Sequence, residues 1–159
     1  MGKKLQYLVI HCTATPEGRE VTEQDIRDWH LSPAPKGRGW KQVGYTNLFQ
    51  LTGINRQLVT NNMDDVVDTW EITNGVAGIN DISYHIVYAG GCDKNMKPKD
   101  TRTDAQKTAM ANFVKKFVCT HFDVKVAGHY QFDNKACPSF NVPEWLRSIG
   151  IHEKNIYKG

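Results

Sequence analysis

Residues 5–12 read LQYLVIHC, a nearly continuous run of strand-forming side chains that ends in a histidine and a cysteine. An apolar run of this length, bounded by polar residues, predicts a mostly buried strand. The run from Leu5 to Ile10 spans only six residues and contains Gln6, whereas the apolar core of a signal peptide needs about 7–15 residues. We therefore interpret it as the first strand of a sheet, and we expect synthesis in the cytosol without a signal peptide.

Three segments further along the chain carry helix signals. We expect helices over 23–31, over 104–121 and after Asn141. Each follows a residue that caps helix N-termini well: Thr22, Thr103 and Asn141. In the second helix, one helical face is apolar, and its members are Met110, Phe113, Val114, Phe117 and Val118.

The remaining β-forming segments alternate with these helices. Further strands are expected over 43–51, 57–60, 82–89 and 125–129, and 61–82 is expected to be a polar surface loop with at most a short element. Alternating strands and helices predict an α/β or α+β sheet with helices packed on its faces. The chain has 159 residues, so we expect one domain.

The composition is that of an ordinary globular protein. There are 20 basic and 17 acidic residues, and the net charge of +3 is too mild and too dispersed to indicate nucleic-acid binding. No apolar run approaches the roughly 20 residues of a membrane helix. Four cysteines are too few for a disulfide-framed fold of this size, so we expect free thiols or metal ligands.

Three residues could form a metal site: His11 at the end of the first strand, His129 at the end of a late strand, and Cys137 in the following segment. Two imidazoles and a thiolate can hold Zn²⁺ and leave a fourth position for water, which is the arrangement of catalytic zinc sites. The spacing matches no standard zinc finger. Taken singly, a histidine in such a position is more often an ordinary polar or core residue than a metal ligand. A cysteine such as Cys137 is likewise more often a buried small residue than a ligand.

Four blocks of sequence together resemble a known family. They are VIHCTAT at 9–15, DIRDWH at 25–30, VGY at 43–45 and KACPSF at 135–140. In the same order they are typical of the zinc-dependent type 2 N-acetylmuramoyl-L-alanine amidases, which include phage amidase-type lysozymes and share a fold with peptidoglycan recognition proteins. The resemblance implies an α/β fold in which a central mixed sheet is flanked by helices, and one catalytic domain over residues 1–159.

The resemblance also implies roles for individual residues. His11, His129 and Cys137 match the ligands of one Zn²⁺, and Tyr45 and Lys135 match catalytic residues. The implied reaction is hydrolysis of the amide that joins the lactyl group of N-acetylmuramic acid to L-alanine. Without the resemblance, Tyr45 would be read as a surface strand residue and Lys135 as a solvated lysine.

Other residues have weaker assignments. Arg38 and Trp40 lie in a basic, aromatic loop and are candidates for lining the glycan groove, although a solvated loop explains them equally well. Thr46 stands where related phage enzymes often have histidine, which puts the substrate contacts in question. His85, in the expected strand 82–89, is interpreted as structural, and Cys12 should point to the opposite face of its strand from His11.

The expected partner is peptidoglycan or its muropeptides, bound by a monomer without nucleic acid or membrane insertion. We expect a phage or prophage endolysin that acts on the cell wall after release or delivery. A non-catalytic peptidoglycan-binding module is the main alternative, and a wall-recycling enzyme or a secreted toxin would use the same amidase chemistry.

Overall fold

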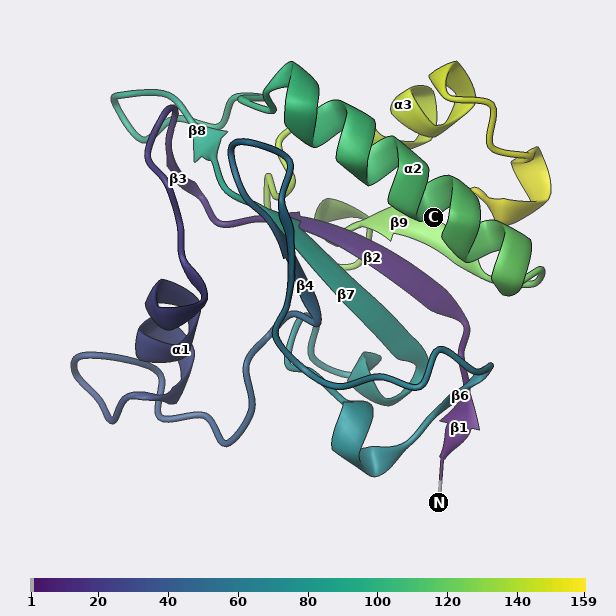
Figure 1. Ribbon diagram of the computed structural model, residues 1–159, viewed down its shortest axis with the longest axis horizontal. Helices are drawn as coiled ribbons and strands as arrows, with labels where there is room; N and C mark the ends of the chain where they lie inside the picture. The colour runs from purple at the N-terminus through teal and green to yellow at the C-terminus, as the bar shows by residue number, and fades with distance from the viewer. Residues whose placement is uncertain (1) are drawn as a thin grey trace.

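A five-stranded sheet forms the centre of the computed structural model, which describes residues 2–159 (Figure 1). Its strands, in spatial order, are β5 (Asn55–Gln57), β4 (Asn47–Phe49), β7 (Ser83–Tyr88), β2 (Tyr7–Cys12) and β9 (Lys125–Gly128). The pairs β4–β7, β7–β2 and β2–β9 are parallel, and the edge pair β4–β5 is antiparallel. The expected central mixed sheet is therefore confirmed.

Two short two-stranded ladders lie outside the five-stranded sheet. β1 (Lys3–Lys4) pairs with β6 (Val66–Val67), and β3 (Thr15–Pro16) pairs with β8 (Gly91–Cys92). Four single-turn 3₁₀ helices lie in the connections of the described chain: η1 (Thr69–Glu71), η2 (Asn80–Ile82), η3 (His129–Gln131) and η4 (Glu153–Asn155).

Three α-helices begin where the capping residues predict. They are α1 (Glu23–Leu31), α2 (Asp104–Thr120) and α3 (Val142–Ser148). Thr22 and Thr103 each form a complete capping box, and the Asn141 side chain accepts from the backbone N–H of Glu144. Each cap satisfies amides that the first helical turn leaves free. In the part of the chain that the structure describes, none of the helices has both the length and the apolar character to cross a bilayer.

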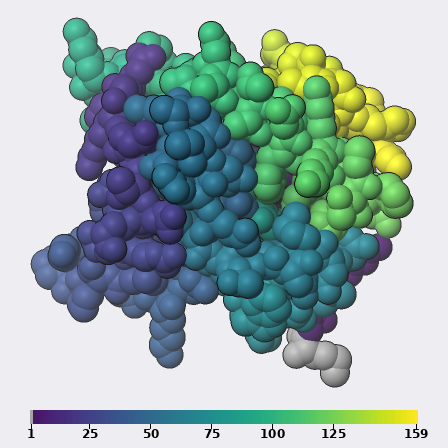
Figure 2. Space-filling model, viewed as in Figure 1, coloured from purple at the N-terminus to yellow at the C-terminus, as the bar shows by residue number. Residues whose placement is uncertain are grey.

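The helices cover opposite faces of the sheet. In Figure 1, α2 and α3 lie together over one side, and α1 stands apart at the other end. A large apolar cluster joins the sheet to α2 and α3, and its fully buried members include Leu8, Ile10, Ile86, Met110, Val114, Val142 and Leu146. A smaller cluster lies on the α1 side, and includes Val21, Ile26, Val43, Leu48 and Val87. Figure 2 shows the blue and teal segments that fill the middle of one face of the molecule, between the purple N-terminal part and the green α2 region.

Two strand predictions need correction. The strand expected over 43–51 is limited to Asn47–Phe49, and the one expected over 57–60 is wrong because β5 occupies Asn55–Gln57. The turn between them contains Gly53 at φ +86°, a backbone conformation that glycine adopts without strain. Leu58 and Val59 leave the sheet and are buried in the α1-side cluster, so their apolar character reflects core packing.

Candidate metal centre

The carboxyl ends of two neighbouring strands bring the two histidines together. β2 and β9 run parallel and side by side, so His11 near the end of β2 lies beside His129, which directly follows β9. Their ring centroids are 4.8 Å apart. Each of His11, His129 and Cys137 offers a donor atom, and these three atoms all lie within 4.8 Å of one another. The group could therefore hold a metal ion.

The loop that carries Cys137 is tied down at several points. The backbone N–H of Tyr130 donates to the carbonyl of Cys137 at 2.9 Å, and the Tyr88 hydroxyl donates to the carbonyl of Pro138 at 2.6 Å. The backbone N–H of Cys12 donates to Cys137 Sγ at 3.1 Å. The Cys12 side chain itself packs in the large apolar cluster under α2 and α3. Cys12 thus contacts the candidate ligand through its backbone N–H, and its thiol also lies against Cys137.

The ionisation of the donor set suits a metal. Burial, with His85 and His129 nearby, lowers the pKa of His11 well below its ordinary value. Burial also lowers the pKa of His129, although the Asp133 carboxylate opposes this shift. Both rings are thus neutral at physiological pH, the form in which imidazole binds metals. The Cys12 thiol and burial raise the pKa of Cys137, so metal binding would release its proton. Two imidazoles and one thiolate are a donor set for a borderline-soft divalent cation.

Tyr45 and Lys135 lie at the same cavity. It has a volume of about 270 Å³ and is lined by Cys12, Thr13, Ala14, Ile26, Trp29, His30, Arg38, Tyr45, His129, Lys135 and Cys137. The Tyr45 ring is half-buried and its centroid lies 5.1 Å from that of His11. Burial, together with Cys137, raises the pKa of Tyr45, so its hydroxyl stays protonated and can donate. Lys135 is exposed at the mouth of the cavity.

The loop candidates occupy different positions. Arg38 lines the cavity, and its guanidinium lies 5.1 Å from the ring centroid of Trp40. Trp40 packs on His30 with ring centroids 4.8 Å apart, and is not among the lining residues. His30 Nδ1 accepts a hydrogen bond of 2.9 Å from the backbone N–H of Gly44, next to Tyr45. Burial lowers the pKa of His30 to about 4, so the neutral ring holds this backbone turn.

Sequence reasoning missed the polar contacts of His85. This residue is fully buried in the central strand β7, and its Nδ1 lies 2.9 Å from His11 Nε2. Its pKa is lowered to about 3, mainly by burial. The available signal was a histidine inside an otherwise apolar strand, since a buried polar group requires a partner. Naming that partner required the register of β2 against β7.

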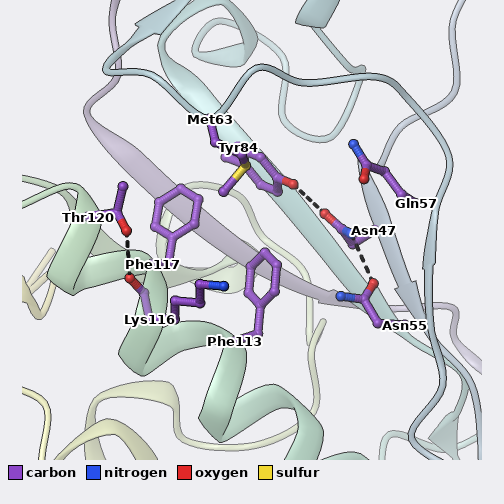
Figure 3. Close-up of a pocket in the computed structure, with 9 residues that line it drawn as sticks. All are labelled: Asn47, Asn55, Gln57, Met63, Tyr84, Phe113, Lys116, Phe117 and Thr120. Atoms are coloured by element: carbon purple, nitrogen blue, oxygen red, sulfur yellow. Dashed lines mark hydrogen bonds between the residues drawn. The ribbon is translucent and has the colours of Figure 1, made fainter.

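A larger cavity lies elsewhere and is separate from this group. It measures about 430 Å³ and is lined by Asn47, Asn55, Gln57, Met63, Tyr84, Phe113, Lys116, Phe117 and Thr120 (Figure 3). Its buried polar groups bond one another: Tyr84 donates to Asn47, and Asn47 Nδ2 donates to Asn55 Oδ1 at 2.9 Å. The residues that line this larger cavity include no histidine or cysteine. The candidate site is therefore distinguished by its metal-binding side chains, and not by the volume of its cavity.

Comparisons with known proteins address the family and the fold. The chain is similar to the endolysin of Enterobacteria phage K11, with 27% identity covering 87% of this chain and 83% of the relative, and to that of Escherichia phage T7, with 25% identity over the same shares. Among solved structures it is similar to the Ph2119 endolysin from a Thermus scotoductus bacteriophage (TM-score 0.71, 22% identity, 96% of this chain and 88% of that one). It is also similar to Drosophila PGRP-LB (TM-score 0.67, 20% identity, covering 100% of this chain and 91% of that one). These structural similarities show the fold. The family model for N-acetylmuramoyl-L-alanine amidase matches residues 1–140, and the protein therefore belongs to this amidase family.

Proposed function

We propose that this chain hydrolyses the amide between the lactyl group of N-acetylmuramic acid and L-alanine, at a zinc ion held by His11, His129 and Cys137. The observation that carries the proposal is the convergence of these three donors within 4.8 Å. They adjoin a cavity that Tyr45 and Lys135 also line.

The donor set fits a catalytic zinc because three protein ligands leave one position open. His11, His129 and Cys137 would hold the zinc ion, which would supply Lewis acidity toward the scissile carbonyl and would lower the pKa of a bound water molecule toward about 7. With Zn²⁺ bound, the Cys137 thiolate would leave the site with one net positive charge, so further groups would have to stabilise the negative charge that develops on the substrate oxygen.

Lys135 and Tyr45 are the groups proposed for that task. The Lys135 ammonium lies at the mouth of the cavity, where it can face a developing oxyanion. Tyr45 keeps its proton because burial raises its pKa, so its hydroxyl can donate to the substrate or orient the attacking water. Arg38 is proposed to contact the glycan or the stem peptide at the same rim, and Trp40 to hold Arg38 in place through the contact between guanidinium and ring.

The biological role that fits is lysis of the bacterial wall by a phage or prophage. Similar curated proteins are endolysins of phages. We propose that residues 1–159 act as a single catalytic domain and a monomer, without nucleic acid or membrane insertion, which reaches the wall after release or delivery. Peptidoglycan or its muropeptides would be the partner.

The test is mass spectrometry of purified peptidoglycan after digestion, with and without a zinc chelator. We expect chelator-sensitive release of stem peptides that begin with a free L-alanine amine, while the glycan strands stay uncut. Release of sugars, or products that form equally well in the presence of chelator, would contradict the proposal. Zinc binding without any product would instead favour a peptidoglycan-binding module.

A further inference from the structure

A chain of hydrogen bonds leads away from the metal centre into the sheet. His11 Nε2 lies 2.9 Å from His85 Nδ1, and His85 Nε2 lies 2.9 Å from Asn80 Oδ1. The same Asn80 oxygen accepts a hydrogen bond of 2.8 Å from the backbone N–H of Val76. The relay thus connects a candidate ligand on β2 to the 3₁₀ turn η2 that precedes β7.

The hydrogen bond from the Val76 backbone determines which atom is donor and which is acceptor in the other two hydrogen bonds of this relay. Because Val76 N–H donates to Asn80, the atom at that position is the amide oxygen, which can only accept. His85 Nε2 therefore carries the hydrogen and donates. A neutral imidazole has one N–H, so His85 Nδ1 accepts. His11 Nε2 must then be the donor, which leaves the lone pair of His11 on Nδ1.

The surroundings hold His85 firmly in this position. Its backbone carbonyl accepts from the N–H of Thr46 at 2.8 Å, and in the parallel ladder it lies opposite Val9 of β2. Its side chain is fully buried. A Cβ placed on Gly75 would overlap the His85 ring, so the absence of a side chain at residue 75 makes room for the imidazole.

We propose that His85 is a positioning residue of the metal centre: it holds His11 in the Nε2–H tautomer and directs Nδ1 of His11 to the metal. The inference rests on the metal role of His11 in the proposed function. Metal-binding histidines commonly donate their second N–H to a partner that fixes the ring and raises its basicity, and loss of such a partner costs about 10–100-fold in metal affinity.

The choice of an imidazole as that partner has a chemical consequence. A carboxylate in the same place would add a negative charge beside a site that already contains the Cys137 thiolate. An imidazole that donates through Nε2 and accepts through Nδ1 carries no charge, so the buried His85 accepts the hydrogen bond without further reducing the positive charge of the centre. The relay therefore orients His11 and preserves the Lewis acidity of the bound ion.

The main experiment compares zinc affinities by competition with a chromophoric chelator. His85→Leu should weaken zinc binding about 10–100-fold, and His85→Gln, which keeps a side-chain acceptor, should recover part of the loss. The matched control is His121→Gln, because His121 is also buried but bonds Asp65 instead of the metal centre. This control should keep wild-type zinc affinity even if it lowers Tm. A loss below twofold in His85→Leu would overturn the proposal.

Two further measurements guard against a variant that fails to fold. In the wild-type, zinc-loaded chain, long-range ¹H–¹⁵N NMR should find the His11 proton on Nε2, and a proton on Nδ1 would overturn the proposal. Gly75→Ala keeps every imidazole but displaces the His85 ring, so it should also weaken zinc binding.

If wild-type protein bound no zinc, the proposed function would fail. If it bound zinc and cut peptidoglycan while the His11 tautomer was wrong, only this inference would fail.

Discussion

The two faces of the central sheet use the same strands for different purposes. On the side of α2 and α3, β2 contributes Leu8 and Ile10 to a large apolar cluster. On the side of α1, the same strand presents His11 one residue before its end, beside a smaller cluster. Side chains alternate across a strand, so one six-residue strand serves both the core and the candidate site. This alternation predicts that a substitution in the α2–α3 core changes stability with little effect on His11, while the Cys137 loop, which packs against that core, connects the two faces.

The largest expected effect is on the chemical face. Cys137→Ser should reduce amidase turnover below detection, because a hydroxyl is a much poorer zinc ligand than a thiolate. The fold should persist, since the loop is also held by Tyr88 and Tyr130. Zinc content, turnover and circular dichroism would be measured on the same preparation. Undiminished turnover in this variant would exclude Cys137 as a required ligand.

The next effect is expected at the rim of the cavity. Lys135→Met should reduce kcat by about 10²–10³, the usual cost of losing a group that stabilises an oxyanion. Zinc affinity should change little because Lys135 is exposed and is outside the donor group. Lys135→Arg, which keeps the charge, is the control and should retain more activity than the methionine variant. Equal kcat values for wild type and Lys135→Met would show that Lys135 does not contribute to catalysis.

On the opposite face, the prediction concerns stability alone. Met110 on α2 is fully buried, so Met110→Ala should lower the free energy of unfolding by about 2–5 kcal/mol. Met110→Leu conserves volume and should cost less than about 1.5 kcal/mol. Urea unfolding and zinc competition would be compared at a temperature where both variants are folded. A change in zinc affinity in the folded alanine variant would show that the two faces are coupled.

The smallest expected effect is a pH dependence on the α1 side. The folded pKa of His30 is about 4, below the ordinary value of about 6.5. The unfolded chain therefore takes up the proton first. His30 contributes stability that is complete above pH 6.5 and is lost as the pH falls toward 4, by at most about 3 kcal/mol.

His30→Gln should reduce this acid sensitivity without abolishing it, because the pKa of His85 is lowered in the same direction. Urea unfolding with chelator present at pH 7, 5.5 and 4 would measure the difference. If the variant and wild type lose stability in parallel, another group is responsible. Since His30 holds the backbone beside Tyr45, a lower kcat at neutral pH would link this turn to catalysis.

Local signals predicted the elements that depend on neighbours in sequence. Thr22 and Thr103 marked helix starts to the residue, because a cap is a contact within four positions. The strand expected over 57–60 is wrong because Leu58 and Val59 follow β5 and are buried in the α1-side cluster. Apolar character alone does not distinguish a strand from a loop that packs on a core.

The sequence by itself determined the α/β class, the helices and the family, because capping pairs, apolar runs and the KACPSF block are contiguous patterns. Only the tertiary structure decided which residues meet. The parallel pairing of β2 with β9 and β7 placed His129 beside His11 and allowed His85 to reach it. Those contacts span 74 residues for His85 and His11, and strand order and register create them. No local pattern encodes such pairings, since they depend on the packing of the whole sheet between its helices.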